Sequence, residues 1–232
     1  NMTGYTYGGT KSTPSVSGNT GNGTVTYYYN TINSNSNGTL WSTVTSSTSL
    51  NAGTYYVYAV VGATTNYNGA TTSAVAFTIS KASIAPTVNM TGYTYGGTKS
   101  TPSVSGNTGN GTVTYYYNTT NSNSNGTLWS TVTSSTSLNA GTYYMYAVIG
   151  ATTNYNGATT AAKSFTISKA SITPTVSMTG YTYGDIKNDP TISGNTGNGT
   201  VTYYYNTTNS NSNGTLWSTV TSSTSLNAGT YY

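Results

Sequence analysis

The chain has 232 residues, of which only 3% are charged, and six lysines and two aspartates give it a formal net charge of +4. It contains no glutamate, arginine, histidine, glutamine or cysteine. This composition excludes a disulfide scaffold and leaves few groups for proton transfer, nucleophilic attack or metal binding. The lysines form no basic patch, so we expect no nucleic-acid partner. The longest apolar run, Tyr55 to Val61, is far shorter than the roughly 20 residues that span a bilayer.

The sequence repeats with a period of 88 residues. The motif Asn-Met-Thr-Gly-Tyr-Thr-Tyr-Gly-Gly begins at Asn1 and again at Asn89, and a close copy begins at Ser177. Residues 1–88 and 89–176 differ at seven positions only. A period of this length is the size of one small domain and is too long for one coil of a solenoid. The chain is therefore predicted to be a piece of a tandem array.

The domain boundaries are predicted near two Lys-Ala-Ser segments, because each follows a strand-like alternation such as Phe77 and Ile79. We predict three domains, named repeats one, two and three. Repeat one, 1–82, lacks part of its first strand. Repeat two, 83–170, is complete, and repeat three, 171–232, lacks its last strands. Since the sequence begins and ends inside the repeat, we expect it to continue in a longer protein.

Within repeat two, all local signals favour β-structure, and none has helical periodicity. Turns are expected at Gly96-Gly97 and in the cluster from Gly106 to Gly111, because Gly and Asn tolerate positive φ. The expected strands, in chain order, are Ile84 to Met90, Pro102 to Ser105, Val113 to Tyr117, Thr127 to Val132, Ser134 to Leu138, Gly141 to Gly150 and Ala158 to Ser168. About seven short strands with short turns predict an antiparallel β-sandwich.

The segment from Gly141 to Gly150 provides the clearest core face. Tyr143, Met145, Ala147 and Ile149 share one side of a strand, because strand side chains alternate. Repeat one has Val57 and Val61 in place of Met145 and Ile149, and these changes stay apolar, as a buried face requires.

This strand resembles strand F of immunoglobulin-like domains, in which an Ala-Gly-x-Tyr motif forms a tyrosine corner. The whole repeat resembles the bacterial and archaeal Ig-like (Big/MBG-type) repeats of large cell-surface and adhesin-like proteins. Matching segments in repeat two are Tyr-Thr-Tyr-Gly (93–96), Gly-Asn-Gly-Thr-Val-Thr-Tyr (109–115), Leu-Trp-Ser-Thr (128–131), Asn-Ala-Gly-Thr-Tyr (139–143), Asn-Tyr-Asn-Gly (154–157) and Phe-Thr-Ile-Ser-Lys-Ala (165–170). The resemblance implies tandem Ig-like sandwiches, with repeat three truncated in strand F. It also implies a corner hydrogen bond from the hydroxyl of Tyr55, Tyr143 and Tyr231.

One tryptophan occurs in each repeat, and an indole usually anchors a core because it buries a large area. We therefore predict that Trp41, Trp129 and Trp217 are core residues; an exposed platform for a ligand is the alternative.

No catalytic, cofactor or metal site is predicted. Asp185 and Asp189 occur in repeat three only, where the other repeats have Gly and Thr, so we interpret them as surface variation. Two carboxylates in the whole chain cannot form one calcium site per domain, and the usual zinc ligands are absent.

The surface has many Asn-x-Ser/Thr sequons, most of them in predicted turns, and we expect glycosylation there. Chance is the alternative, since Asn and Thr are so common. The candidate acceptors are Asn1, Asn22, Asn37, Asn89, Asn110, Asn118, Asn125, Asn198, Asn206 and Asn213. Three-tyrosine segments such as Tyr115-Tyr116-Tyr117 put aromatic rings on both faces of a strand, and the outward rings could stack on sugars, on another domain or on another chain. Ordinary pairing with side chains of the neighbouring strand is the alternative.

The expected function is structural: an extracellular stalk, adhesin shaft or filament of tandem domains, located at the cell surface or secreted. Its expected partners are neighbouring copies or adjacent domains, with glycans or another cell surface as further candidates. A carbohydrate-binding module using exposed Tyr and Asn is the main alternative. An amyloid-like assembling tract and an enzyme are the remaining alternatives, and we expect no enzyme and no cofactor.

Overall fold

The computed structural model describes residues 1–232 and is all-β, with three short 3₁₀ turns and no α-helix. Two compact units are present, Asn1–Lys169 and Ala170–Tyr232. The first contains repeats one and two, each with its own sheet, and the second contains repeat three. The boundary between the units lies one residue before the predicted start of repeat three.

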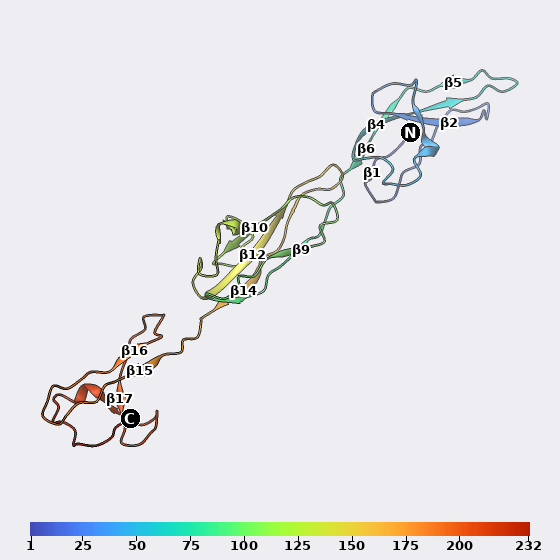
Figure 1. Ribbon diagram of the computed structural model, residues 1–232. Helices are drawn as coiled ribbons and strands as arrows, with labels where there is room; N and C mark the ends of the chain where they lie inside the picture. Colours follow the sequence, from blue (N-terminus) through green and yellow to red (C-terminus); the bar gives the residue numbers. More distant parts are fainter. The chain divides into compact units, whose positions relative to one another are not determined.

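Repeat two is a sandwich of a large and a small sheet (Figure 1). The large sheet has the order β11-β10-β12-β14-β8, with β13 paired to β12. Its strands are β8 (Tyr93–Thr94), β10 (Val113–Asn118), β11 (Thr127–Leu128), β12 (Gly141–Ile149), β13 (Ala158–Thr159) and β14 (Lys163–Ser168). The small sheet pairs β7 (Thr87–Asn89) with β9 (Ser103–Ser105) and packs against β12.

The core of repeat two lies between these two sheets. Met145, Ala147 and Ile149 on β12 are fully buried, as the strand alternation predicts. They pack with Val88 from β7 and Phe165 from β14 in one apolar cluster. Trp129, Ile167 and Val132 complete the cluster, and the burial of apolar surface of this kind is the main stabilising term for such a domain.

Repeat one repeats the large sheet, with the order β1-β6-β4-β2-β3 and with β5 paired to β4. The strands are β1 (Tyr5–Thr6), β2 (Val25–Asn30), β3 (Thr39–Leu40), β4 (Gly53–Val61), β5 (Ala70–Thr71) and β6 (Val75–Ser80). The pairing of β2 with β4 and of β4 with β6 has the same register as the pairing of β10 with β12 and of β12 with β14.

Repeat three forms two small separate sheets. One pairs β15 (Thr175–Ser177) with β16 (Thr191–Ser193), and the other pairs β17 (Tyr204–Tyr205) with β18 (Thr215–Leu216). The 3₁₀ turn η3 (Trp217–Thr219) follows β18, as η1 (Trp41–Thr43) and η2 (Trp129–Thr131) follow the equivalent strands of the other repeats.

The structure confirms the all-β fold and corrects several details. Strands β8 and β14 pair in parallel, as do β1 and β6, so each large sheet is mixed rather than purely antiparallel. Repeat two has eight short strands rather than about seven: the predicted strand from Ala158 to Ser168 is divided and β8 was not expected, while the strand predicted from Ser134 to Leu138 does not form.

Two strand predictions were wrong for a local reason. The strand expected from Thr127 to Val132 stops at Leu128, where η2 begins, and Thr131 Oγ1 donates to the Leu128 carbonyl. The segment from Ser134 to Leu138 forms turns, because the Ser137 hydroxyl accepts from the Ser134 amide and the Ser137 amide donates to the Ser134 carbonyl. Such short-range bonds from Ser and Thr compete with strand pairing.

Candidate interaction surfaces

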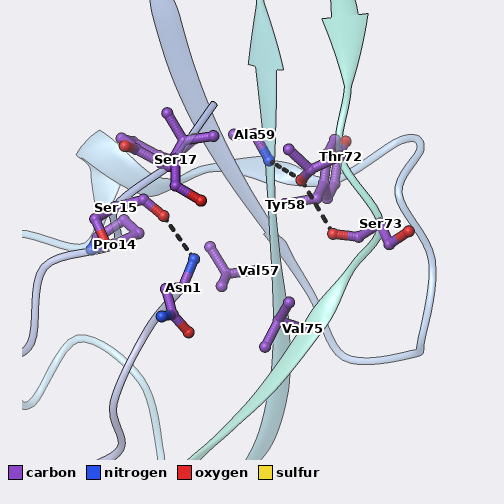
Figure 2. Close-up of a pocket in the computed structure, with 12 residues that line it drawn as sticks. Asn1, Pro14, Ser15, Ser17, Val57, Tyr58, Ala59, Thr72, Ser73 and Val75 are labelled. Atoms are coloured by element: carbon purple, nitrogen blue, oxygen red, sulfur yellow. Dashed lines mark hydrogen bonds between the residues drawn. The ribbon is translucent and has the colours of Figure 1, made fainter. Parts of the chain in front are cut away.

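The first cavity lies in repeat one and contains no reactive group (Figure 2). Asn1, Ser15, Val57 and Thr72 line part of a space of about 140 Å³. At its polar edge the Thr72 hydroxyl accepts from the Ala59 amide at 3.0 Å and donates to the Ser73 carbonyl, and the ammonium group of Asn1 donates to the Ser15 carbonyl. In repeat two the equivalent space is filled by β7, whose Val88 side chain is buried. This cavity is therefore a core position of the sandwich.

A second, larger cavity of about 540 Å³ lies within repeat three. It is lined mainly by apolar and aromatic side chains, among them Val176, Met178, Tyr181, Trp217 and Leu226. The counterparts of Val176 and Met178 in repeat two, Val88 and Met90, are buried in the core. Here too the cavity corresponds to core space, and none of its lining residues is charged.

The predicted tyrosine corners have the same geometry in all three repeats. The hydroxyls of Tyr55, Tyr143 and Tyr231 donate to the carbonyls of residues four positions earlier, Asn51, Asn139 and Asn227, at 3.0–3.1 Å. In repeats one and two the bond ties the start of a strand, β4 or β12, to the loop before it. The hydroxyls therefore stabilise the fold and are engaged rather than available to a ligand.

The three tryptophans are buried, with Lys11, Lys99 and Lys187 lying over their rings at 5.0–5.1 Å from the ring centroids. An ammonium group at this distance is attracted by the negative face of an indole. The position of the indoles corresponds to a core anchor and leaves no exposed aromatic platform at these three sites.

Two outward-facing tyrosine pairs of the central strands, Tyr28 with Tyr58 and Tyr116 with Tyr146, are engaged in the fold. Tyr146 faces away from the main core but is buried, and its hydroxyl accepts from the Gly126 amide at 2.9 Å. Its ring stacks on Tyr116 with centroids 5.3 Å apart, and Tyr28 and Tyr58 form the same pair in repeat one. Within residues 1–169, the exposed tyrosines are Tyr67 and Tyr95, at 55% and 37% of their full surface.

The candidate glycosylation sites fall into distinct groups. Six of them are exposed Asn-Gly turn residues in the left-handed region, with φ of 50–59°: Asn22, Asn37, Asn110, Asn125, Asn198 and Asn213. Asn118 and Asn206 differ, because their side-chain amides donate to two serine carbonyls each. Asn1 and Asn89 are exposed, and Asn89 Oδ1 accepts from Lys163. An acceptor amide must be reachable, so the six turn residues are the best placed.

The two aspartates, Asp185 and Asp189, differ in their hydrogen bonding. Asp189 accepts from Lys187 Nζ at 2.7 Å and from the Trp217 indole at 3.1 Å. The hydrogen bond from Lys187, which has the larger effect, and the one from Trp217 lower the pKa of the Asp189 carboxyl below its usual value. Asp185 is exposed and has no such partner among the side chains. The interpretation of Asp189 as mere surface variation missed this contact, because the contact depends on the fold.

No three acidic, histidine or cysteine side chains gather at one place, and the structure holds no helix with the length and hydropathy of a membrane span.

A joint between repeats one and two is the most specific polar surface in the structure. The loop 152–156 of repeat two forms hydrogen bonds with Lys81 and Ala82, which lie between the two repeats. The Ala82 amide donates to the Asn154 carbonyl at 2.9 Å, and the Asn156 amide donates to the Ala82 carbonyl at 2.8 Å. Lys81 Nζ donates to the Thr152 carbonyl at 2.6 Å.

The same loop also contacts the body of repeat one. The Asn154 side chain accepts from the Ala52 amide at 2.8 Å and donates to Asn51 Oδ1 at 2.9 Å. Tyr155 packs edge-on against Tyr7, with ring centroids 5.7 Å apart. The Asn154 amide accepts through Oδ1 and donates through Nδ2, whereas an ionised aspartate at this position could only accept.

Sequence reasoning did not identify the joint residues as a group. They lie on four separate segments, and only the fold brings them together. Tyr7, Asn51, Lys81, Asn154 and Tyr155 are each identical at the equivalent position of the neighbouring repeat, but so are all but seven of the 88 positions, so identity did not single them out. Comparison of the chain with protein-family models and with curated protein sequences yields no match.

Proposed function

We propose that this chain is a structural segment of an extracellular shaft, adhesin stalk or filament, in which tandem Ig-like domains act by extension and display. The observation that carries the proposal is the joint between repeats one and two. It is built from residues that the repeats share, so the same contact can recur along an array.

The chemistry of the joint favours a mechanical role. Its hydrogen bonds arise from two backbone bonds to Ala82 and from the Lys81 and Asn154 side chains. A typical hydrogen bond contributes about 0.5–1.5 kcal/mol net, so several acting together hold two domains in one arrangement. A held joint makes an array stiff, whereas an unstructured linker would make it flexible.

The groups that a catalytic or sugar-binding role would need are engaged in the fold. The hydroxyls of Tyr58 and Tyr146 accept from backbone amides, and lysines lie over the buried indoles. The six exposed Asn-Gly turns supply places for glycans, which would solubilise a surface that has few charges.

Stiffness of the joint can be measured in the full chain, since it contains no cysteine and two dyes can be attached at chosen positions. Ser42→Cys and Ser130→Cys place one dye on each repeat at equivalent exposed sites. We expect a narrow distribution of single-molecule energy transfer for the otherwise unchanged chain and a broad one for Asn154→Ala. Asn66→Ala changes the equivalent asparagine outside the joint and should leave the distribution narrow. A broad distribution before any change at Asn154 would contradict the mechanical role.

Location and binding are tested separately. Antibodies against the chain should label intact source cells, and labelling that requires permeabilised cells would contradict an extracellular role. A glycan array probed with the full chain should give no binding. Binding that disappears in Tyr67→Ala would instead favour a carbohydrate-binding module.

A further inference from the structure

The chain contains eight Asn-Gly bonds, which can all undergo the same reaction. The glycine amide nitrogen can attack the carbonyl carbon of the asparagine side chain, because glycine has no Cβ to obstruct the approach. Six of the bonds are the turns described above as candidate glycosylation sites, and the other two are Asn68-Gly69 and Asn156-Gly157. Since glycine follows asparagine in every case, differences in reactivity must arise from the structure.

In repeats one and two, the glycine amide of every such turn is hydrogen-bonded. The Gly111 amide donates to Asn107 Oδ1 at 3.1 Å, and the Gly126 amide donates to the Tyr146 hydroxyl at 2.9 Å. The equivalent glycines of repeat one make the same two bonds. Before it can attack, an amide nitrogen must leave its acceptor and lose its proton, so each of these bonds slows the reaction.

The two remaining glycines, Gly69 and Gly157, have a different environment. Neither lies in a strand, and neither amide has a hydrogen-bond acceptor in the protein. Asn156 and Gly157 are exposed, although Asn156 belongs to the loop that forms the joint. The open amide is therefore a property of the loop itself and is present in the completed joint.

We propose that Asn156 is a site of spontaneous deamidation, which alters the joint with time. The Gly157 nitrogen forms a bond to Asn156 Cγ, and the side-chain nitrogen leaves as ammonia, taking up through solvent the proton that the Gly157 amide loses. The product is a cyclic succinimide. Water then opens the ring at one of its two carbonyls and leaves aspartate or isoaspartate. Water is the only co-reactant, and Asn68 should react in the same way.

Either product weakens the joint, a consequence that rests on the proposed function. Asn156 Nδ2 lies 3.5 Å from the Lys81 carbonyl oxygen, and the Asn156 backbone amide donates to the Ala82 carbonyl at 2.8 Å. A carboxylate cannot donate to the Lys81 carbonyl. Isoaspartate also adds a methylene group to the backbone directly beside the bond to Ala82. The joint should therefore loosen as the protein ages.

The test is peptide mapping of the full chain after incubation in mildly alkaline buffer. Chymotrypsin cleaves after tyrosine and tryptophan, so Asn110, Asn125 and Asn156 fall in different peptides, and mass spectrometry gives the deamidated fraction of each. We expect Asn156 to react roughly two- to twelvefold faster than the other two, the ratio that corresponds to one ordinary hydrogen bond. In denaturant, where these bonds are lost, the three rates should converge.

Tyr146→Phe isolates the protecting hydrogen bond. It removes the acceptor of the Gly126 amide and keeps the ring, so Asn125 should react faster while Asn110 keeps its rate. Near-ultraviolet circular dichroism checks that the variant is folded. Three results would overturn the proposal: an Asn156 rate no higher than that of the two turn residues, the same order of rates in the unfolded chain, or an unchanged Asn125 rate in folded Tyr146→Phe.

Energy transfer between dyes at positions 42 and 130 tests the effect on the joint. The distribution should broaden in the unchanged chain after incubation and stay narrow in Asn156→Ser, which cannot form the succinimide. Asn68 is present in both samples, so the pair isolates position 156. A distribution that stays narrow despite deamidation of Asn156 would refute the loosening. A distribution that is broad before incubation refutes the stiff shaft alone, because the mapping still decides whether Asn156 reacts.

Discussion

The segment Val-Thr-Tyr-Tyr-Tyr-Asn occurs in repeats two and three with identical sequence and different structure. In repeat two, residues 113–118 form the six-residue strand β10, which pairs along its full length with β12. In repeat three, residues 201–206 form the two-residue strand β17, paired only with β18. Residues 170–232 contain no counterpart of Met145–Ile149 to pair with. Strand length in this fold is therefore decided by the partner strand, and intrinsic propensity is secondary.

The burial of equivalent apolar residues also differs between repeats two and three. The exposed fraction of Val88 is 3% and that of its counterpart Val176 is 63%; for Met90 and Met178 the values are 6% and 41%. The small sheet that carries these residues forms in both repeats, with the same pairing of three residues. Local pairing is thus independent of the core, whereas burial requires the central strands of the large sheet.

The largest expected contrast between the two repeats comes from their tryptophans. Trp129→Ala should destabilise repeat two by roughly 3–5 kcal/mol, because its ring packs edge-on against both Tyr117 and Phe165. Trp217→Ala should have a clearly smaller effect, since that ring has only Tyr205 as an aromatic neighbour. Hydrogen exchange of the amides in β12 and in β17 measures both. Equal losses of protection would show that the two cores are equally closed.

Gly111 and the equivalent Gly199 differ in the space available for a Cβ atom. A Cβ at Gly111 would lie 2.0 Å from the Gly150 carbonyl oxygen, whereas a Cβ at the equivalent Gly199 meets nothing closer than 3.8 Å. Gly111→Ala should therefore cost about 1–3 kcal/mol through forced backbone shifts, and Gly199→Ala should change stability by no more than about 0.5 kcal/mol. Denaturant unfolding of the two variants, compared with the unchanged chain, provides the measurement. A neutral Gly111→Ala would mean that β10 and β12 can separate without loss.

The buried hydroxyl of Tyr93 is the next difference between repeats two and three. Tyr93 is buried and its hydroxyl has no hydrogen-bond partner, and burial raises the pKa of this phenol. Tyr93→Phe should be neutral or stabilising by about 1 kcal/mol, because it removes an unpaired polar group. The raised folded-state pKa favours the neutral phenol, so this residue lowers stability as the pH rises above about 10. Thermal unfolding at pH 8 and pH 11 should show a smaller loss in Tyr93→Phe. Tyr181→Phe, in repeat three, is the control.

Asp189 gives the smallest expected effect. Its pKa is lowered in the folded chain by Lys187 and Trp217, so its contribution is present above the ordinary value of 3.8 and is lost as the pH falls through the lowered value. The protection of amides around Trp217, relative to the intrinsic exchange rate at each pH, should therefore fall below about pH 4. Asp189→Thr introduces the residue found in the other two repeats and should remove this dependence. A pH dependence that persists in Asp189→Thr would show that another group is responsible.

The periodic features of the fold could be predicted from the sequence. The alternation from Tyr143 to Ile149 predicted the buried face of β12, and the Gly and Asn clusters predicted turns. Alternation and turn chemistry are local properties, which is why they can be identified from the sequence. Two features were not: the parallel pairing of β8 with β14 and the turns from Ser134 to Leu138. The first depends on distant segments, and the second on competition between side-chain and backbone hydrogen bonds.

The candidate surfaces show the same division. The sequons could be found directly as a motif, but the sequence did not show that Asn118 uses its amide to bind two serine carbonyls. The outward ring of Tyr116 was a candidate for stacking on a sugar or another chain, and it stacks instead on Tyr146 of the neighbouring strand. The joint was missed because its residues lie up to 149 positions apart in the chain, from Tyr7 to Asn156.

The hydrogen bonds between Ala82 and loop 152–156 also affect which peptide bonds a protease can cleave. Enzymes that cleave after lysine must bind the scissile segment as an extended strand with free backbone groups. The Lys81–Ala82 bond does not offer these groups, since the Ala82 amide and carbonyl are both bonded to loop 152–156 and Lys81 donates to Thr152. Lys81 and the equivalent Lys169 are both exposed, but the Ala170 amide and carbonyl make no such backbone hydrogen bonds. Limited digestion with trypsin should therefore cut after Lys169 first and release residues 1–169 as one durable fragment.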